Sequence, residues 1–125
     1  MSTRKSTTLV LILSADPVAA ALLGGLVELL GYGVQFASIE EGVDAGLRRT
    51  HPRIYLVDCE TTQGEATAAL GHARMRGIAV VLVGPPALLA QMRELARLHD
   101  AEIVFTPPEA EPLGEALDRA ARKAG

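Results

Sequence analysis

Two aspartates that each follow a short apolar run are the residues best placed to do chemistry. Asp58 ends the run RIYLVD at residues 53–58, and Asp16 comes three residues after the run LVLIL at 9–13. A carboxylate in such a position can act as a nucleophile or help to hold a divalent cation, which takes oxygen ligands. Because open α/β sheets place their sites beyond the carboxyl ends of the strands, we expect both side chains at one sheet edge.

The elements that must position these carboxylates are five strands alternating with five helices. We expect strands at 9–13, 33–37, 54–58, 78–83 and 102–105, and helices at about 17–30, 41–49, 65–76, 87–99 and 111–123. Such alternation predicts parallel βαβ units with right-handed crossovers, and hence a doubly wound α/β sheet. The strand at 33–37 alternates more than the others, so we expect it at an edge of the sheet.

Local signals define the ends and faces of the helices. Asp16 before Pro17 predicts a helix start with Asp16 as the cap, and Ser38 with Glu41 predicts a capping box for the second helix. Apolar residues at helical spacing predict faces that pack on the sheet. In the first helix they are Val18, Leu22, Leu23, Leu26, Leu29 and Leu30, and in the fourth Leu88, Leu89, Met92, Leu95 and Leu98.

Composition predicts one domain over residues 8–125, with a flexible end at 1–7, and excludes several classes of function. The formal net charge is −3 and aromatic residues are only 3% of the 125, so we expect no nucleic-acid contact. No stretch reaches the roughly 18 apolar residues of a membrane span. The single cysteine, Cys59, excludes an internal disulfide and fits a cytoplasmic protein. Its side chain should point into the core as a small hydrophobe.

Read from the residues alone, both aspartates also have structural interpretations. Asp58 could cap the turn that follows its strand, and Asp16 could serve only as a helix cap. Metal binding by Asp16 and capping by Asp16 can coexist if the side chain faces the crevice. We find no Ser-His-Asp or Cys-His arrangement and no metal-binding His/Cys cluster among the motifs, so an independent enzyme is not predicted.

With these elements in place, the chain resembles over nearly its whole length the receiver domain of bacterial response regulators, the CheY-like family. The resemblance implies a flavodoxin-like (βα)5 fold of strand order 2-1-3-4-5. It implies Asp58 as the candidate phosphoacceptor of a two-component phosphorelay. It also implies a Mg²⁺ site made by Asp16, Asp58 and the backbone carbonyl of Glu60.

The chain departs from the family pattern at four positions around that site. Ala15 replaces one acid of the family's acidic pair, Gly84 replaces a Ser or Thr, and Thr106 replaces the lysine. Ile103 stands at the aromatic switch position, and Pro107 matches the proline that follows a cis bond in the family. Loss of one positioned donor typically costs about 3–4 kcal/mol of transition-state stabilisation. We therefore predict a pseudo-receiver with weak or absent phosphorylation at Asp58 and little Mg²⁺ binding.

Three functions remain open on these residues. The leading one is an atypical receiver-like signalling domain that acts through protein contacts. The resemblance implies as partners a sensor kinase, an output domain or a second copy, docking on 87–99, 102–105 and 111–123. The first alternative is a functional, Mg²⁺-dependent phosphoaccepting response regulator. The second is a flavodoxin-like module that binds a small ligand or nucleotide, with the loop at 60–64 as the only candidate phosphate cradle.

Overall fold

The computed structural model describes residues 8–38 and 40–124, so the predicted flexible end at 1–7 lies outside the described residues. The strands are β1 (Leu9–Leu13), β2 (Gly33–Ala37), β3 (Ile54–Asp58), β4 (Ala79–Gly84) and β5 (Glu102–Phe105). The helices are α2 (Pro17–Leu29), α3 (Val43–Thr50), α4 (Gln63–Met75), α5 (Leu89–His99) and α6 (Ala110–Lys123), with a 3₁₀ turn, η1 (Pro86–Leu88), before α5.

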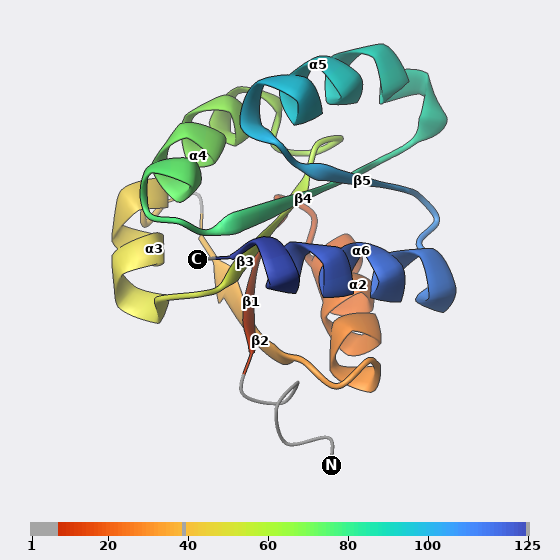
Figure 1. Cartoon of the computed structure of the whole chain (residues 1–125), viewed down its shortest axis with the longest axis horizontal. Helices are drawn as coiled ribbons and strands as arrows, with labels where there is room; N and C mark the ends of the chain where they lie inside the picture. Colours follow the sequence, from red (N-terminus) through yellow and green to blue (C-terminus); the bar gives the residue numbers. More distant parts are fainter. Residues whose placement is uncertain (1–7, 39, 125) are drawn as a thin grey trace.

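The strands form one parallel sheet of order β2-β1-β3-β4-β5, which confirms the predicted doubly wound (βα)5 fold. Helices α2 and α6 cover one face of the sheet, and α3, α4 and α5 cover the other (Figure 1). Strand β2 lies at an edge, as its weaker apolar pattern predicted. Among the described residues, no helix has both the length and the apolar character that a bilayer crossing needs.

Strand β3 lies at the centre of the sheet and is buried along its whole length. Because side chains alternate across a strand, Ile54 and Leu56 join the cluster under α2 and α6. Tyr55 and Val57 join the cluster under the three helices of the other face. The strand therefore has packing on both faces, which fixes the place where Asp58 leaves the sheet.

The predicted capping box at Ser38 and Glu41 is wrong. Helix α3 begins at Val43, its N-cap position is Gly42, and no side chain caps it. A turn begins at Ser38, whose carbonyl accepts from the Glu41 N–H at 3.1 Å, and the helix starts only after Gly42, whose φ of +91° is a conformation that glycine adopts without strain. The Glu41 carboxylate is instead 2.6 Å from the guanidinium of Arg49, which lies in the last turn of α3.

Two of the predicted core-facing stripes are only partly buried. In α2, Leu23, Gly24 and Val27 are buried, whereas Val18, Leu22 and Leu29 are 67%, 67% and 85% exposed. In α5, Met92 is buried but Leu98 is 49% exposed. A helix lying on a sheet buries a stripe of roughly 100°, and the apolar positions of α2 extend well beyond that arc. The prediction that all of them pack on the sheet is wrong.

Burial on both faces of the sheet should make β3 the most sensitive element to truncation. We expect Leu56→Ala to lower the free energy of unfolding by about 2–5 kcal/mol, because Leu56 is 0% exposed and its cavity cannot fill with water. Urea unfolding followed by circular dichroism measures the change. The matched control is Leu98→Ala, which removes the same atoms from a half-exposed site; a similar loss for both variants would contradict the layered core.

Candidate functional site

The carboxylate of Asp58 lies at the carboxyl end of β3 and is held by three donors. Asp58 is 5% exposed. The Ser14 hydroxyl donates to its Oδ2 at 2.8 Å and the Thr61 hydroxyl to the same oxygen at 3.1 Å. The backbone N–H of Glu60 donates to Oδ1 at 3.2 Å. The charge is thus compensated by neutral donors within the fold, as a buried carboxylate requires.

A second layer of bonds joins the loops that carry these donors. Thr61 Oγ1 accepts from the backbone N–H of Ala15 at 2.9 Å, and Thr62 Oγ1 donates to the backbone carbonyl of Asp58 at 2.6 Å. The loop after β1 and the loop after β3 are therefore tied to each other through Asp58. Ser14 and Thr61 were not predicted as site residues. Only their positions in the sequence could have indicated them as site residues. Ser14 directly follows the first strand, and Thr61 is three residues after Asp58.

Asp16 acts as the cap of α2, as the sequence predicted. Its backbone is extended, and its Oδ1 accepts from the N–H of Val18 at 3.0 Å. The side chain is exposed, unlike that of Asp58. Within the part of the chain that the structure describes, no three His, Cys, Asp or Glu side chains are grouped to hold a metal ion. A Mg²⁺ site built from Asp16, Asp58 and the Glu60 carbonyl remains a prediction.

The space beside Gly84 is filled by a side chain from α5. A Cβ built on Gly84 would lie 2.9 Å from the sulfur of Met92 and 3.6 Å from Cβ of Cys59. Met92 is completely buried. The Met92 thioether therefore packs against Gly84, one of the positions at which the sequence departs from the family pattern. The sequence predicted Met92 only as part of the apolar stripe of its helix, because nothing in the spacing relates residue 92 to residue 84.

The other positions that depart from the family pattern surround the same sheet edge. Thr106 donates its backbone N–H to the carbonyl of Gly84 at 2.9 Å, and the Thr106–Pro107 peptide bond is cis. Ile103 packs against the core cluster under α3, α4 and α5, and Ala15 is exposed. None of these four side chains carries a charge. At the four positions that depart from the family pattern, the sheet edge around Asp58 therefore carries hydroxyl, amide and apolar groups.

Cys59 is buried next to Asp58, as predicted. Its side chain is 2% exposed, and its sulfur lies 3.9 Å from the carbonyl oxygen of Val57. Burial, aided by the negative charge of Asp58, raises the pKa of the Cys59 thiol to about 11. At neutral pH the group is therefore a thiol inside the core and a poor nucleophile.

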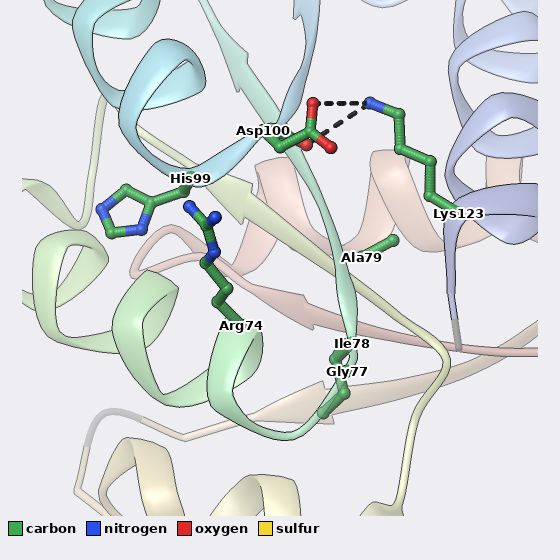
Figure 2. A pocket seen from close by; sticks show the side chains of 7 residues that line it. All are labelled: Arg74, Gly77, Ile78, Ala79, His99, Asp100 and Lys123. Atoms are coloured by element: carbon green, nitrogen blue, oxygen red, sulfur yellow. Dashed lines mark hydrogen bonds and ion pairs between the residues drawn. The ribbon is translucent and has the colours of Figure 1, made fainter.

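A separate hollow of about 250 Å³ lies at the opposite end of the sheet, before β4. Figure 2 shows Arg74, His99, Asp100 and Lys123 around it. The Lys123 ammonium is 3.4 Å from Asp100 Oδ1 and 2.7 Å from Glu102 Oε2, and Arg74 donates to a backbone carbonyl. Because these cations are already paired within the fold, we do not assign an anion site there.

Comparison with known proteins identifies the fold but no close relative. No protein-family model matches the chain, and no curated protein matches it. A solved protein assigned to pilus assembly in Burkholderia pseudomallei has a TM-score of 0.79 and 22% identity, covering 97% of this chain and 94% of that one. The N-terminal receiver domain of a Bacteroides fragilis response regulator has a TM-score of 0.78 and 21% identity, covering 90% and 95%.

A second protein assigned to pilus assembly, CpaE of Burkholderia thailandensis, has a TM-score of 0.72 and 25% identity, covering 93% of this chain and 99% of that one. The TM-scores over nearly the full length of each chain show that these structures share the fold of this one. The chain therefore has the CheY-like fold of response regulator receiver domains, as the sequence predicted.

The packing of Met92 against Gly84 predicts a strong coupling between the two positions. We expect Gly84→Ser to lower the free energy of unfolding by about 1–3 kcal/mol, because the added atoms overlap the Met92 sulfur. In Met92→Ala that space is open, so the double variant should be less destabilised than the sum of the single variants. A double-mutant cycle by urea unfolding measures this. Additive losses would show that the two side chains do not compete for space.

The raised pKa of Cys59 predicts a loss of stability in mild alkali. The folded state holds the thiol proton more tightly than the unfolded chain, so this contribution is complete below pH 9 and is lost as the pH rises towards 11. Between pH 8 and pH 10, the wild type should lose about 1 kcal/mol more than Cys59→Ala.

Urea unfolding at the two pH values tests this. The higher pH of the experiment is kept at 10 because Tyr32 also contributes above it. The ordinary pKa of a tyrosine is 10, and burial and the hydrogen bond to Asp118 raise the pKa of Tyr32 in the folded state. A Cys59→Ala variant that loses as much stability as the wild type over this range would contradict the prediction.

Proposed function

We propose that this chain is an atypical receiver-type signalling domain of a two-component-type system, which acts through contacts with other proteins and in which phosphorylation of Asp58 is weak or absent. The observation that carries the proposal is the binding of the Asp58 carboxylate by neutral hydroxyl donors from Ser14 and Thr61. Both hydroxyls donate to Oδ2 of the carboxylate that phosphotransfer would use as its nucleophile, and these hydrogen bonds weaken that oxygen as a nucleophile.

The chemistry of phosphoryl transfer gives the reason. Negative charge spreads over the transferred group and must be neutralised by cations and by positioned donors. Thr106 stands where the receiver family has its lysine, and Ala15 stands where it has a second acid for Mg²⁺. Gly84 stands where the family has its phosphoryl-binding hydroxyl, and the Met92 thioether packs beside it. Each of these changes removes stabilisation from the transition state while leaving the fold intact.

The partner surface that fits this role is the one formed by α5, β5 and α6. It carries half-exposed apolar side chains, Leu98 at 49% and Phe105 at 43%, beside the exposed Arg93 and Arg97. A hollow of about 370 Å³ lies between β5 and the start of α6, lined in part by Phe105 and Pro112. Apolar anchors flanked by charge are typical of protein interfaces. We propose that a sensor kinase or an output domain docks there, in the cytoplasm.

Two of the similar structures, those from Burkholderia, are proteins assigned to pilus assembly. We propose a comparable setting for this chain, in which a receiver fold serves a larger assembly by binding and not by group transfer. Pull-down of partners with the folded chain, compared with Phe105→Asp, would test whether the α5, β5 and α6 surface is the one used.

The second candidate function is Mg²⁺-dependent phosphorylation of Asp58. The observation in its favour is that the Asp58 carboxylate is retained at the carboxyl end of β3. Asp16 is the N-cap of α2, in the loop after β1. Binding of a nucleotide phosphate by the loop after β3 has less support, since the Glu60 N–H already donates to Asp58.

Labelling with a small phosphodonor in the presence of Mg²⁺ separates the two candidates. We expect the wild type to incorporate phosphate no faster than Asp58→Asn, and at least about 100-fold more slowly than an intact receiver domain, because two positioned donors are missing. The variant Ala15→Asp/Thr106→Lys restores one acid and the lysine at positions that are not fully buried, so it should label faster than the wild type.

The matched control adds Asp58→Asn to that double variant and should abolish the gain. Wild-type labelling at the rate of an intact receiver, lost on Asp58→Asn, would overturn the proposal in favour of the second candidate. Backbone amide shifts on adding Mg²⁺ and beryllofluoride give an independent readout at residues 14–16, 58–61 and 84.

A further inference from the structure

Strand β5 forms one edge of the sheet, between α5 and α6 (Figure 1). The Thr106 N–H donates to the Gly84 carbonyl of β4 at 2.9 Å, so the backbone of Thr106 faces into the sheet. Because the backbone groups of successive strand residues point to opposite sides, the N–H and C=O groups of Ile103 and Phe105 face away from β4. Within residues 8–38 and 40–124, these groups have no hydrogen-bond partner, and we call them the open edge of β5.

The opposite edge of the sheet is covered by a charged side chain. The Gly33 N–H of β2 donates to the Thr8 carbonyl at 3.0 Å, so Gly33 faces β1 and the backbone of Phe36 faces outward. The Arg49 guanidinium donates to the Phe36 carbonyl at 3.3 Å and is held in place by Glu41. Charged side chains at an edge strand oppose pairing with another chain. Of the two edges, β5 is therefore the one that can accept a further strand.

The one charged residue of β5 does not protect its edge in the same way. The Glu102 carboxylate is 2.8 Å from the Arg119 guanidinium and 2.7 Å from the Lys123 ammonium. Both cations belong to α6, so the charge of Glu102 is held against that helix. The backbone groups of Ile103 and Phe105 are left without a neighbouring charged guard.

A hollow of about 370 Å³ accompanies the open edge. It is lined by residues 103–107, and by Glu109 and Pro112 at the start of α6. Most of these residues are apolar, and Phe105 is 43% exposed. The hollow therefore offers space for an apolar side chain beside the unpaired backbone groups.

We propose that an extended segment of another protein pairs with the open edge of β5 and adds a sixth strand to the sheet. An extended chain presents N–H and C=O groups along its edge, whereas a helix uses these groups internally. In strand addition, main-chain hydrogen bonds give affinity and pockets for alternate side chains give specificity. The hollow supplies such a pocket. Because Pro107 and Pro108 have no N–H, the paired stretch is short.

Charge indicates the composition of that segment. Glu109 is exposed and is the charged residue among those that line the hollow, and Glu111 adds a second acid in the first turn of α6. On α5, Arg97 is paired with Glu94 at 2.6 Å, and Arg93 does not line the hollow. We therefore expect an apolar residue in the hollow and a Lys or Arg next to it in the segment.

A second copy of this chain fits the open edge less well than such a segment. Its own β5 and the residues around it, 100–108, contain Asp100 and Glu102 but no Lys or Arg. Pairing of two β5 strands would bring no cation to Glu109 and would add acids near it. The occupant we propose is thus a basic extended segment of a different protein.

The inference rests on the proposed function in one respect, the use of the α5, β5 and α6 surface, and it adds how the partner is recognised. The two can fail separately. Labelling reports only on Asp58. Loss of a partner on Phe105→Asp, for a partner whose binding needs no backbone pairing, would leave the proposed function standing and overturn strand addition.

Amide hydrogen exchange of the free chain tests the open edge itself. We expect the Ile103 and Phe105 N–H groups to exchange at least about 10-fold faster than those of Val104 and Thr106, which face β4. NMR measures the four rates. Equal protection at all four positions would show that the edge is already covered and would overturn the proposal.

Peptides test the pairing without changing the protein. The probe is a phage-displayed library of random seven-residue peptides, selected on the full chain, and the strongest binder is then synthesised. Only one side of an extended peptide faces β5, so N-methylation of one alternate set of its amides should weaken binding at least about 10-fold. Methylation of the other set is the matched control. No binder, or equal binding of both methylated forms, would overturn the proposal.

Variants of the chain place the peptide on β5. Phe105→Pro removes one outward N–H at an edge position that tolerates proline, and Phe105→Ala removes the ring but keeps the N–H. We expect Phe105→Pro to bind the selected peptide at least about 10-fold more weakly than Phe105→Ala, with native folding checked by circular dichroism. Equal binding would overturn the proposal. So would sedimentation showing a dimer that Phe105→Pro dissociates, which would assign the edge to a second copy.

Discussion

The constraint on which the site depends is the burial of one charge at the end of a strand that is itself buried. Asp58 leaves β3 with 5% of its surface exposed, so its carboxylate must find donors within the protein. Ser14 and Thr61 supply them from the loops after β1 and β3, and the Ala15 N–H fixes Thr61 in turn. The acid that could act as a nucleophile is thereby also the group that holds two loops together. The carboxylate oxygens that accept these hydrogen bonds are the same atoms that would react in a nucleophilic attack.

Met92 connects that site to the surface on the far side of α5. Its sulfur fills the space beside Gly84, while its backbone belongs to the helix that carries the exposed Arg93 and Arg97. The Met92 side chain is fully buried there, and close-packed interiors resist small shifts.

The sequence predicted the sheet well because its strongest signals are local. Runs such as 9–13 and 54–58 are apolar without alternation, which identified central strands, and the weaker run at 33–37 identified an edge. The site was predicted only in part. Asp58 and Asp16 follow strands in the sequence, but the Ser14 and Thr61 bonds to Asp58 and the contact of Met92 with Gly84 join segments whose relation appears only after folding. The capping box predicted at Ser38 failed for a local reason, because Gly42, with its positive φ, is the N-cap position of α3.

The exposed leucines of α2 show why apolar periodicity alone does not locate a core. A helical wheel records that a residue is apolar, and the sheet accepts only one stripe of a helix, so the remaining apolar positions must pack on something else or face water. In α2 the residues left over, Val18, Leu22 and Leu29, are not scattered but aligned along one line. In water, a continuous apolar strip promotes unspecific association more than the same residues would if they were scattered. The exposed apolar side chains of α2 lie on one face of the sheet and α5 lies on the other, so the two helices present separate surfaces.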